Sequence, residues 1–352
     1  MNQINGRQTT CLLLVILSGW ALTMTAENGR DGWIIVLLAS LLILPIATLC
    51  CLPAEQLPGI QWYALPNAIF GRSFGTVYLC ALVALAFWSL CMTVLNGVIF
   101  LRTVSGGQWY IWLLTAAILL CAAAAAQHGI ARLVLWTEPV VWLVIAALAI
   151  SLLLSLRQID WNALFPVMEN GWQGTPMRVY LLLSVPFGEV FFAAAALGGT
   201  GTQTRIGLLR ACILAGVLLC LLYIRNICLL GQSGANAVLY PSYTAASVLT
   251  FGESFQRGEA LISGSLIVCI VARAALLLDF LSGCSQAVTT HGTQKRGVWL
   301  FAVIAGIVCS LCAGSNDAFA NAQQLYQLLL LPFVLIAAVT LAIGVMIKKK
   351  NG

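Results

Sequence analysis

Charged residues are scarce in this chain of 352 residues. Only 8% of the residues are Asp, Glu, Lys or Arg, whereas 61% are hydrophobic. A soluble domain of this size carries far more charge on its surface, so the composition excludes one. The formal net charge of +6 does not indicate a nucleic-acid partner, because the basic residues stand mostly at the ends of apolar runs. The expected surroundings are the lipid bilayer.

Residues that carry common catalytic or metal chemistry are also few or poorly placed. The two histidines, His128 and His291, fall in predicted loops. The 13 cysteines lie mostly inside apolar runs, where a cysteine behaves as a small hydrophobic residue. We therefore expect no disulfide framework, no metal site and no cofactor. Neither a Ser-His-Asp set nor a phosphate-binding loop stands out, and an enzyme is not expected.

Ten apolar runs extend along the chain, and each is about as long as a helix that crosses a bilayer. They predict an all-α polytopic membrane protein that folds as a single integral-membrane domain over 1–352. The first run lacks a small-residue cleavage site and is expected to remain as the first span. The predicted spans are 9–25, 32–52, 74–101, 108–126, 130–156, 178–199, 207–231, 259–285, 297–313 and 324–347.

The basic residues predict the orientation of these spans. If the N-terminus lies in the cytoplasm, the inner loops and tail receive Arg132, Arg205, Arg210 and the run Lys348–Lys350. Cytoplasmic loops generally carry the excess of Lys and Arg, so both chain ends are expected in the cytoplasm. Segment 59–71 is short and amphipathic, and it is expected to lie at the membrane interface.

The sixth predicted span contains the sequence of a broken helix. Residues 184–189 read Ser-Val-Pro-Phe-Gly-Glu, where proline removes a backbone donor and glycine loosens the turn. A break at membrane depth is tolerated where it lines a cavity enclosed by protein. Glu189 stands at this break, and an ionisable residue inside a membrane indicates a functional site by default. The alternative is a proline-kinked helix with a neutral, hydrogen-bonded Glu189.

The first span carries a weaker break at Ser18, Gly19 and Trp20, five spans before the sixth. Paired breaks are typical of transporters built from two inverted repeats, with the solute between the unwound segments. We therefore expect a 5+5 inverted repeat with discontinuous helices 1 and 6, the first repeat over about 9–156 and the second over about 178–347. Free N–H groups at the breaks favour a carboxylate and free carbonyls favour an ammonium, which together suit an amino acid.

Two further ionisable residues fall inside predicted spans. Arg273 lies near the middle of the eighth span and needs an anion. The candidates are Glu189, a substrate carboxylate, and Asp279 two turns onward. Glu138 precedes Pro139 in the fifth span. It is either a protonatable group, able like Glu189 to couple proton or ion movement, or a residue bonded to free backbone donors in a loosened turn.

Several motifs resemble those of the B subunit of GerA-type spore germinant receptors, a branch of the amino acid/polyamine/organocation permease superfamily. The resemblance covers nearly the whole chain. Its most specific part is the stretch that runs from Tyr240-Pro241-Ser242-Tyr243 to Phe255-Gln256-Arg257-Gly258-Glu259. The other matching residues are Asp31-Gly32-Trp33, Gly129, Arg132, Pro139, Phe165-Pro166-Val167, Gly171-Trp172 and Pro186-Phe187-Gly188-Glu189.

The resemblance implies a receptor in the inner membrane of a bacterial endospore. Such a receptor binds a small nutrient, typically an amino acid, at mid-membrane and triggers germination with germinant receptor A and C subunits. It places the nutrient among spans 1, 3, 6 and 8. In this chain the implied contacts are Ser18, Gly19, Phe187, Gly188, Glu189 and the face that carries Arg273, with Trp20 as a candidate side-chain contact.

Two other functions stay open. A proton-coupled amino-acid permease would have the same fold, with Glu189 or Glu138 as the proton carrier. A structural or channel subunit would bind no ligand, and an amino acid would not stabilise it.

Overall fold

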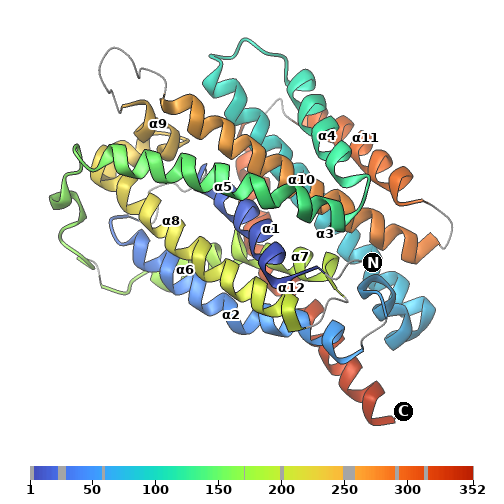
Figure 1. The fold of residues 1–352 in the computed structure, drawn as a ribbon. Coiled ribbons are helices and arrows are strands. Elements are labelled where there is room, and N and C mark those ends of the chain that lie inside the picture. Colours follow the sequence, from blue (N-terminus) through green and yellow to red (C-terminus); the bar gives the residue numbers. More distant parts are fainter. Residues whose placement is uncertain are drawn as a thin grey trace.

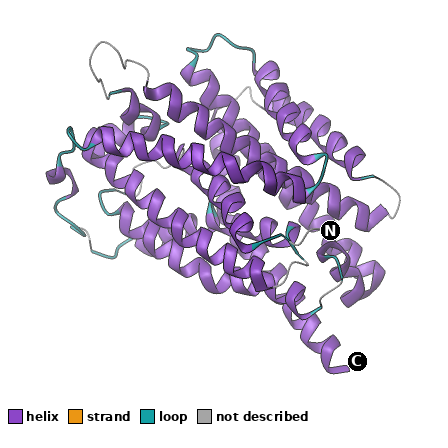
Figure 2. Cartoon of the chain, viewed as in Figure 1, coloured by secondary structure: helices purple, strands orange, loops and turns teal. Residues whose placement is uncertain are grey.

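The computed structural model describes residues 4–22, 29–57, 60–169, 171–198, 202–248, 258–289, 293–312 and 316–351. This part of the chain consists of helices and connecting loops and contains no β-strand (Figure 2). His291 and residues 255–257 of the motif noted above lie outside the described residues.

The helices follow the predicted apolar runs closely. They are α1 (Gly6–Ser18), α2 (Gly32–Gln56), α3 (Leu65–Val104), α4 (Ile111–Ala126), α5 (Ile130–Ser155), α6 (Thr175–Ser184), α7 (Val190–Ala196), α8 (Thr202–Ala237), α9 (Pro241–Ser247), α10 (Gly258–Thr289), α11 (Gln294–Cys312) and α12 (Asn316–Asn351). Short 3-10 turns are η1 (Gly19–Leu22), η3 (Trp62–Ala64), η4 (Trp161–Leu164) and η5 (Phe187–Glu189).

Among the described residues, eight segments are long and apolar enough to cross a membrane, with α6, η5 and α7 counted as one. The shorter apolar helix α4 and the α1–η1 segment complete the ten predicted spans. Figure 1 shows both chain ends at one end of the bundle, opposite α9. The all-α polytopic membrane fold is therefore confirmed.

The spans form two related sets of five. In the first set α1 packs on α5 and on α8, whereas in the second set the α6–α7 span packs on α12 and on α2. The contacts are equivalent in the two sets. Helices α5 and α12 are the last spans of their own sets, and α8 and α2 are the second spans of the opposite sets. Five spans cross a membrane an odd number of times, so the second set must have inverted topology.

Close contact between α8 and its neighbours depends on small residues, as is usual between membrane helices. A Cβ at Gly207 would lie 2.7 Å from the Thr9 Cβ, and the carbonyl of Gly6 would be closer still. On the other side of α8, Gly216 faces the Ser40 side chain at a distance that leaves no room for a methyl group. These contacts hold α1 and α2 against the same helix.

Trp62, in the segment 59–71 that is predicted to lie at the membrane interface, is covered by other helices. Trp62 in η3 is only 1% exposed, and its ring packs edge-on against Phe191 with 5.6 Å between centroids. Phe280 packs on the same indole, so the segment inserts an aromatic side chain between α7 and α10. Amphipathicity alone cannot tell a lipid-facing aromatic residue from one that is covered by other helices, so the burial of Trp62 was not predicted.

The α1–α8 contact predicts unequal effects of two Gly→Ala variants. Gly207→Ala should lower the free energy of unfolding by about 1–3 kcal/mol, because the added methyl group overpacks the contact with Thr9. Gly264→Ala is the matched control, since nothing lies within 4 Å of the position of its Cβ. Thermal unfolding of the purified protein in detergent measures both, and equal melting temperatures would contradict the assigned packing.

Candidate functional site

The sixth span breaks where the sequence predicts. Helix α6 ends at Ser184, and Val185 has extended backbone angles (φ −134°, ψ 116°). Pro186 cannot donate a backbone hydrogen bond, and the chain re-enters helix through η5 before α7 begins at Val190. Glu189 therefore stands where the second half of the span begins.

Helix α12 satisfies backbone groups around this break. Pro332 lies inside α12 and cannot donate to the carbonyl of Leu328, four residues earlier. The Tyr180 hydroxyl of α6 donates to that carbonyl instead, at 2.5 Å. The Leu331 backbone N–H donates to the Ser184 Oγ at 3.2 Å. The end of α6 is thus joined to the proline turn of α12.

The first span changes from α-helix to a 3-10 turn at Gly19. The Ser18 hydroxyl donates to the Val15 carbonyl at 3.0 Å and lies 3.6 Å from the Cys269 Sγ. A Cβ at Gly19 would come 2.8 Å from the Cys269 Cβ. Glycine at this position lets α10 approach the break closely, and the predicted discontinuity of both spans is confirmed.

A buried ion pair joins the sixth span to α10. Glu189 is 4% exposed and Arg273 7%, and an Arg273 terminal nitrogen donates to the Glu189 Oε1. The same oxygen accepts the Tyr326 hydroxyl at 2.9 Å and the Ser89 hydroxyl at 3.1 Å. Four spans therefore meet at one carboxylate, since Ser89 belongs to α3 and Tyr326 to α12.

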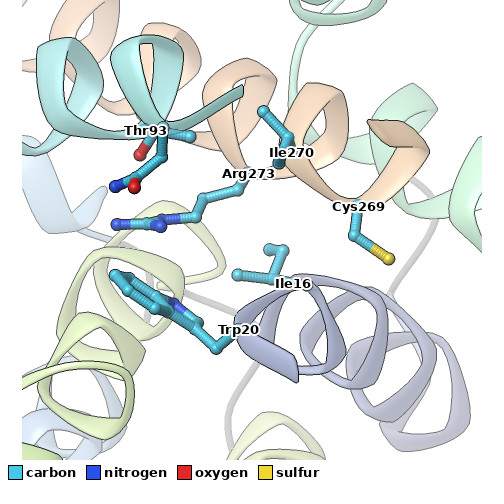
Figure 3. A pocket seen from close by; sticks show the side chains of 8 residues that line it. Ile16, Trp20, Thr93, Cys269, Ile270 and Arg273 are labelled. Atoms are coloured by element: carbon cyan, nitrogen blue, oxygen red, sulfur yellow. The ribbon is translucent and has the colours of Figure 1, made fainter. Parts of the chain in front are cut away.

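The guanidinium of Arg273 also lies over the first break. Its Cζ is 4.2 Å from the ring centroid of Trp20 in η1, and Figure 3 shows the indole against the guanidinium. A cation over an indole face is attracted by the ring quadrupole, more strongly when water is excluded. Arg273 thus contacts both broken spans at once.

Each partner of this ion pair retains one unsatisfied atom. The Arg273 Nε and the Glu189 Oε2 are buried and have no hydrogen-bond partner among the described residues. An unsatisfied buried donor or acceptor is costly and indicates a strained or ligand-binding site. The pair therefore offers one donor and one acceptor that the protein itself does not use.

A small cavity lies beside Arg273, between α1, α3 and α10. Its volume is about 20 Å³, close to the least space that holds one water molecule. Its walls are lined by Ile16, Gly19, Trp20, Thr93, Asn96, Cys269, Ile270 and Arg273 (Figure 3). A nutrient would need more room, so the side chains around the cavity must separate before one enters.

The structure brings part of the predicted site together. Gly19, Trp20 and Arg273 line the cavity, and Glu189 adjoins it through the ion pair. Ser18 lies one residue away, beside Cys269. Phe187 is fully buried but does not line the cavity.

Gly188 has a different neighbour. The position of its Cβ lies 3.6 Å from the Leu330 Cδ2 and 3.5 Å from the Leu183 carbonyl. This glycine therefore faces α12 and not the cavity.

Glu138 stands apart from this site. Its Oε1 lies 3.6 Å from the Arg7 Nε, and the two side chains are 32% and 66% exposed. Asp279 also has another partner, because its Oδ1 accepts the Gln294 side-chain amide at 2.5 Å. Of the anions considered for Arg273, the structure therefore provides Glu189.

Two residues that contact Glu189 were not singled out from the sequence. The first is Ser89, which shares one face of α3 with Thr93 and Asn96 at spacings of four and three residues. This polar pattern on an apolar helix could have identified Ser89. Tyr326 gave no such signal, because a tyrosine in an apolar run is usually a packing residue.

Arg225 was also missed, although it is an ionisable residue inside a predicted span. It is 1% exposed and donates to the Asn226 Oδ1 at 2.8 Å, to the Ser242 carbonyl at 2.9 Å and to the Ser151 hydroxyl. The Ser242 hydroxyl in turn donates to the Ala21 carbonyl at 2.6 Å. This cluster joins α5, α8 and α9 to η1.

Cys309 and Cys312 have the spacing of a CxxC motif, which the expectation about cysteines did not take into account. Both lie on α11, where Cys309 is buried with its Sγ 3.8 Å from the Cys91 carbonyl oxygen and Cys312 is exposed. Within the described ranges, no three His, Cys, Asp or Glu side chains are arranged to hold a metal ion.

Comparison with known proteins places this geometry in context. A sequence model of the family described as spore germination protein matches residues 3–318. No curated protein matches the chain.

Solved transporters share the fold at low identity. A Na⁺-coupled sialic acid symporter in a substrate-bound, outward-open state has a TM-score of 0.70 at 13% identity, over 94% of this chain and 78% of the symporter. A nucleobase-cation-symport-1 family transporter, closed with bromovinylhydantoin bound, has a TM-score of 0.67 at 12% identity, over 97% and 92%. MhsT in complex with L-phenylalanine has a TM-score of 0.64 at 13% identity, over 94% and 87%.

The ion pair predicts strong coupling between two substitutions. Arg273→Met or Glu189→Gln alone should lower the free energy of unfolding by about 3–5 kcal/mol, because each leaves a buried polar partner uncompensated. The double variant should recover much of that loss. Thermal unfolding in detergent provides the double-mutant cycle, with Arg132→Met at an exposed position as the control. Additive losses would show that the two side chains do not interact.

Proposed function

The chain belongs to the spore germination protein family, and we propose that it is a germinant receptor subunit that binds a nutrient, with an amino acid as the favoured ligand. The family and fold are those of a membrane transporter or receptor and not of an enzyme. The proposed site is the cavity between α1, α3 and α10, which Gly19, Trp20 and Arg273 line, together with the adjoining Ser18 and Glu189.

The observation that carries this proposal is the ion pair with its two unused atoms. A free amino acid has an ammonium group and a carboxylate. The Glu189 Oε2 can accept from the ammonium, and the Arg273 Nε can donate to the carboxylate, so both buried atoms would gain partners. Charge-assisted hydrogen bonds of this kind are the stronger ones in proteins.

Because the cavity is small, nutrient binding must change the packing of the surrounding helices, and this change would be the signal of the receptor. A nutrient can enter only if Trp20 and its neighbours move, and it shifts the equilibrium only by its differential affinity for the two arrangements. Tyr326 contacts the carboxylate directly, so a change at Glu189 reaches α12. We propose that α12 passes this change to germinant receptor A and C subunits.

The proposed location is the inner membrane of the endospore, with both chain ends in the cytoplasm. The ends of α3 and α12 that would face the cytoplasm are joined, because the Lys348 Nζ donates to the Ala68 carbonyl at 2.9 Å. Lysines at a helix end are typical of the cytoplasmic side.

A proton-coupled amino-acid permease is the second candidate. It is favoured by the three solved structures described above, each of which is a transporter with the same fold. Glu189 would then carry the proton. Glu138 is a weaker candidate for this role, because it pairs with Arg7 at a half-exposed position away from the cavity.

Spores that lack this gene should fail to germinate with one or a few amino acids from a panel of single nutrients. Their uptake of the same amino acids during growth should be unchanged, because a receptor senses its ligand without supplying the cell. Normal germination combined with reduced uptake would overturn the receptor proposal in favour of the permease.

Filling the cavity should weaken the response in intact spores. Thr93→Leu should raise the amino-acid concentration for half-maximal germination by about tenfold or more, because overpacking costs typically 1–3 kcal/mol. Thr115→Leu is the matched control, since Thr115 is also buried and its hydroxyl also bonds the carbonyl four residues earlier. Both variants must reach wild-type levels in spore membranes, and equal responses would place the site elsewhere.

A further inference from the structure

We propose that the guanidinium of Arg273 is a tethered cation that takes the place of a dissolved coupling cation in this site. The ligand would then bind without Na⁺ or K⁺ as a partner. The inference deepens the proposed function, since it concerns how the same site operates, but its test requires no nutrient.

The positive charge of Arg273 lies between the two broken spans. Arg273 extends from α10 between the two broken spans, where it pairs with Glu189 of η5 and lies 4.2 Å from the ring centroid of Trp20 in η1. Figure 3 shows the guanidinium in the space between α1, α3 and α10. The place where unwound segments could hold a cation is therefore already occupied by a positive group of the protein.

The cavity supplies few of the oxygen ligands that a free cation would need. Hard cations take several oxygen ligands. The Glu189 Oε1 already accepts from Arg273, Ser89 and Tyr326, which leaves the Oε2 as the one unused oxygen of this carboxylate. Among the residues that line the cavity, only Thr93 and Asn96 have oxygen-bearing side chains, which is fewer than the six to eight oxygens that a hard cation such as Ca²⁺ takes. The remaining side chains in the lining are apolar, aromatic, thiol or cationic.

The charge of Arg273 also disfavours a dissolved cation in the cavity. A dissolved cation brings no anion of its own, so it would stand beside the guanidinium in surroundings of low dielectric constant, where like charges repel strongly. A zwitterionic amino acid differs, because its carboxylate enters together with its ammonium group. Arg273 is 7% exposed and is held by both the carboxylate and the indole. Because its charge is covalently attached to α10, it does not leave the site as a dissolved ion does. The charge of Glu189 is compensated permanently, and no ion has to enter or leave with each ligand.

Cation-dependent stability tests this inference with the full-length protein in detergent. Melting temperatures are measured in sodium, potassium and choline chloride at equal ionic strength and at mildly alkaline pH. The wild-type protein should melt at the same temperature in all three salts. Arg273→Gln leaves Glu189 without its cation, so sodium or potassium should raise its melting temperature saturably by several degrees relative to choline.

Two further variants keep the result interpretable. Arg273→Lys retains a tethered charge, so its melting temperature should be the same in the three salts. This variant provides a test even if Arg273→Gln does not fold. The double variant Glu189→Gln with Arg273→Gln lacks both charges and should also show no cation effect. A saturable sodium or potassium effect on the wild-type protein or on Arg273→Lys would overturn the proposal. So would a folded Arg273→Gln variant that does not respond to either cation.

Discussion

The buried ion pair between Glu189 and Arg273 is the constraint on which the centre of this structure depends. Removing two charges from water costs several kcal/mol for each ion, and only good geometry with additional hydrogen bonds repays that cost. Ser89 and Tyr326 supply those bonds to the carboxylate. Because neither charge is tolerable alone at membrane depth, the positions of η5, α10, α3 and α12 are linked to one another.

The breaks in the spans raise a second requirement, since a free backbone group in a membrane needs a partner within the protein. The sequence places Pro186 in the sixth span and Pro332 in α12, and the structure joins the end of α6 to the turn before Pro332. Tyr180 and Ser184 then satisfy the groups at Leu328 and Leu331. The irregular backbone thereby becomes a joint between two helices and does not remain a local defect.

The sequence was sufficient for the ten spans, for the break at Pro186 and for the end of α1 at Ser18, because length, hydropathy and proline act locally. It could not show that Trp62 is buried, since that depends on Phe191 and Phe280, which are distant in the chain. Nor could it show that Gly188 faces α12, because a glycine has no side chain whose character indicates a direction. Tyr326 was missed for the related reason that its partner lies on another helix.

The two buried arginines, Arg273 and Arg225, connect the cavity to the end of the bundle where α9 lies (Figure 1). Arg225 has no carboxylate partner among the described residues, and neutral groups of Asn226, Ser242 and Ser151 receive its donors. The Ser242 hydroxyl also reaches back to the Ala21 carbonyl. Trp20 and Ala21 are consecutive, so the residue whose indole covers Arg273 adjoins the residue whose carbonyl α9 binds. The cavity and α9 are therefore connected through two consecutive residues of η1, which form a contiguous physical link.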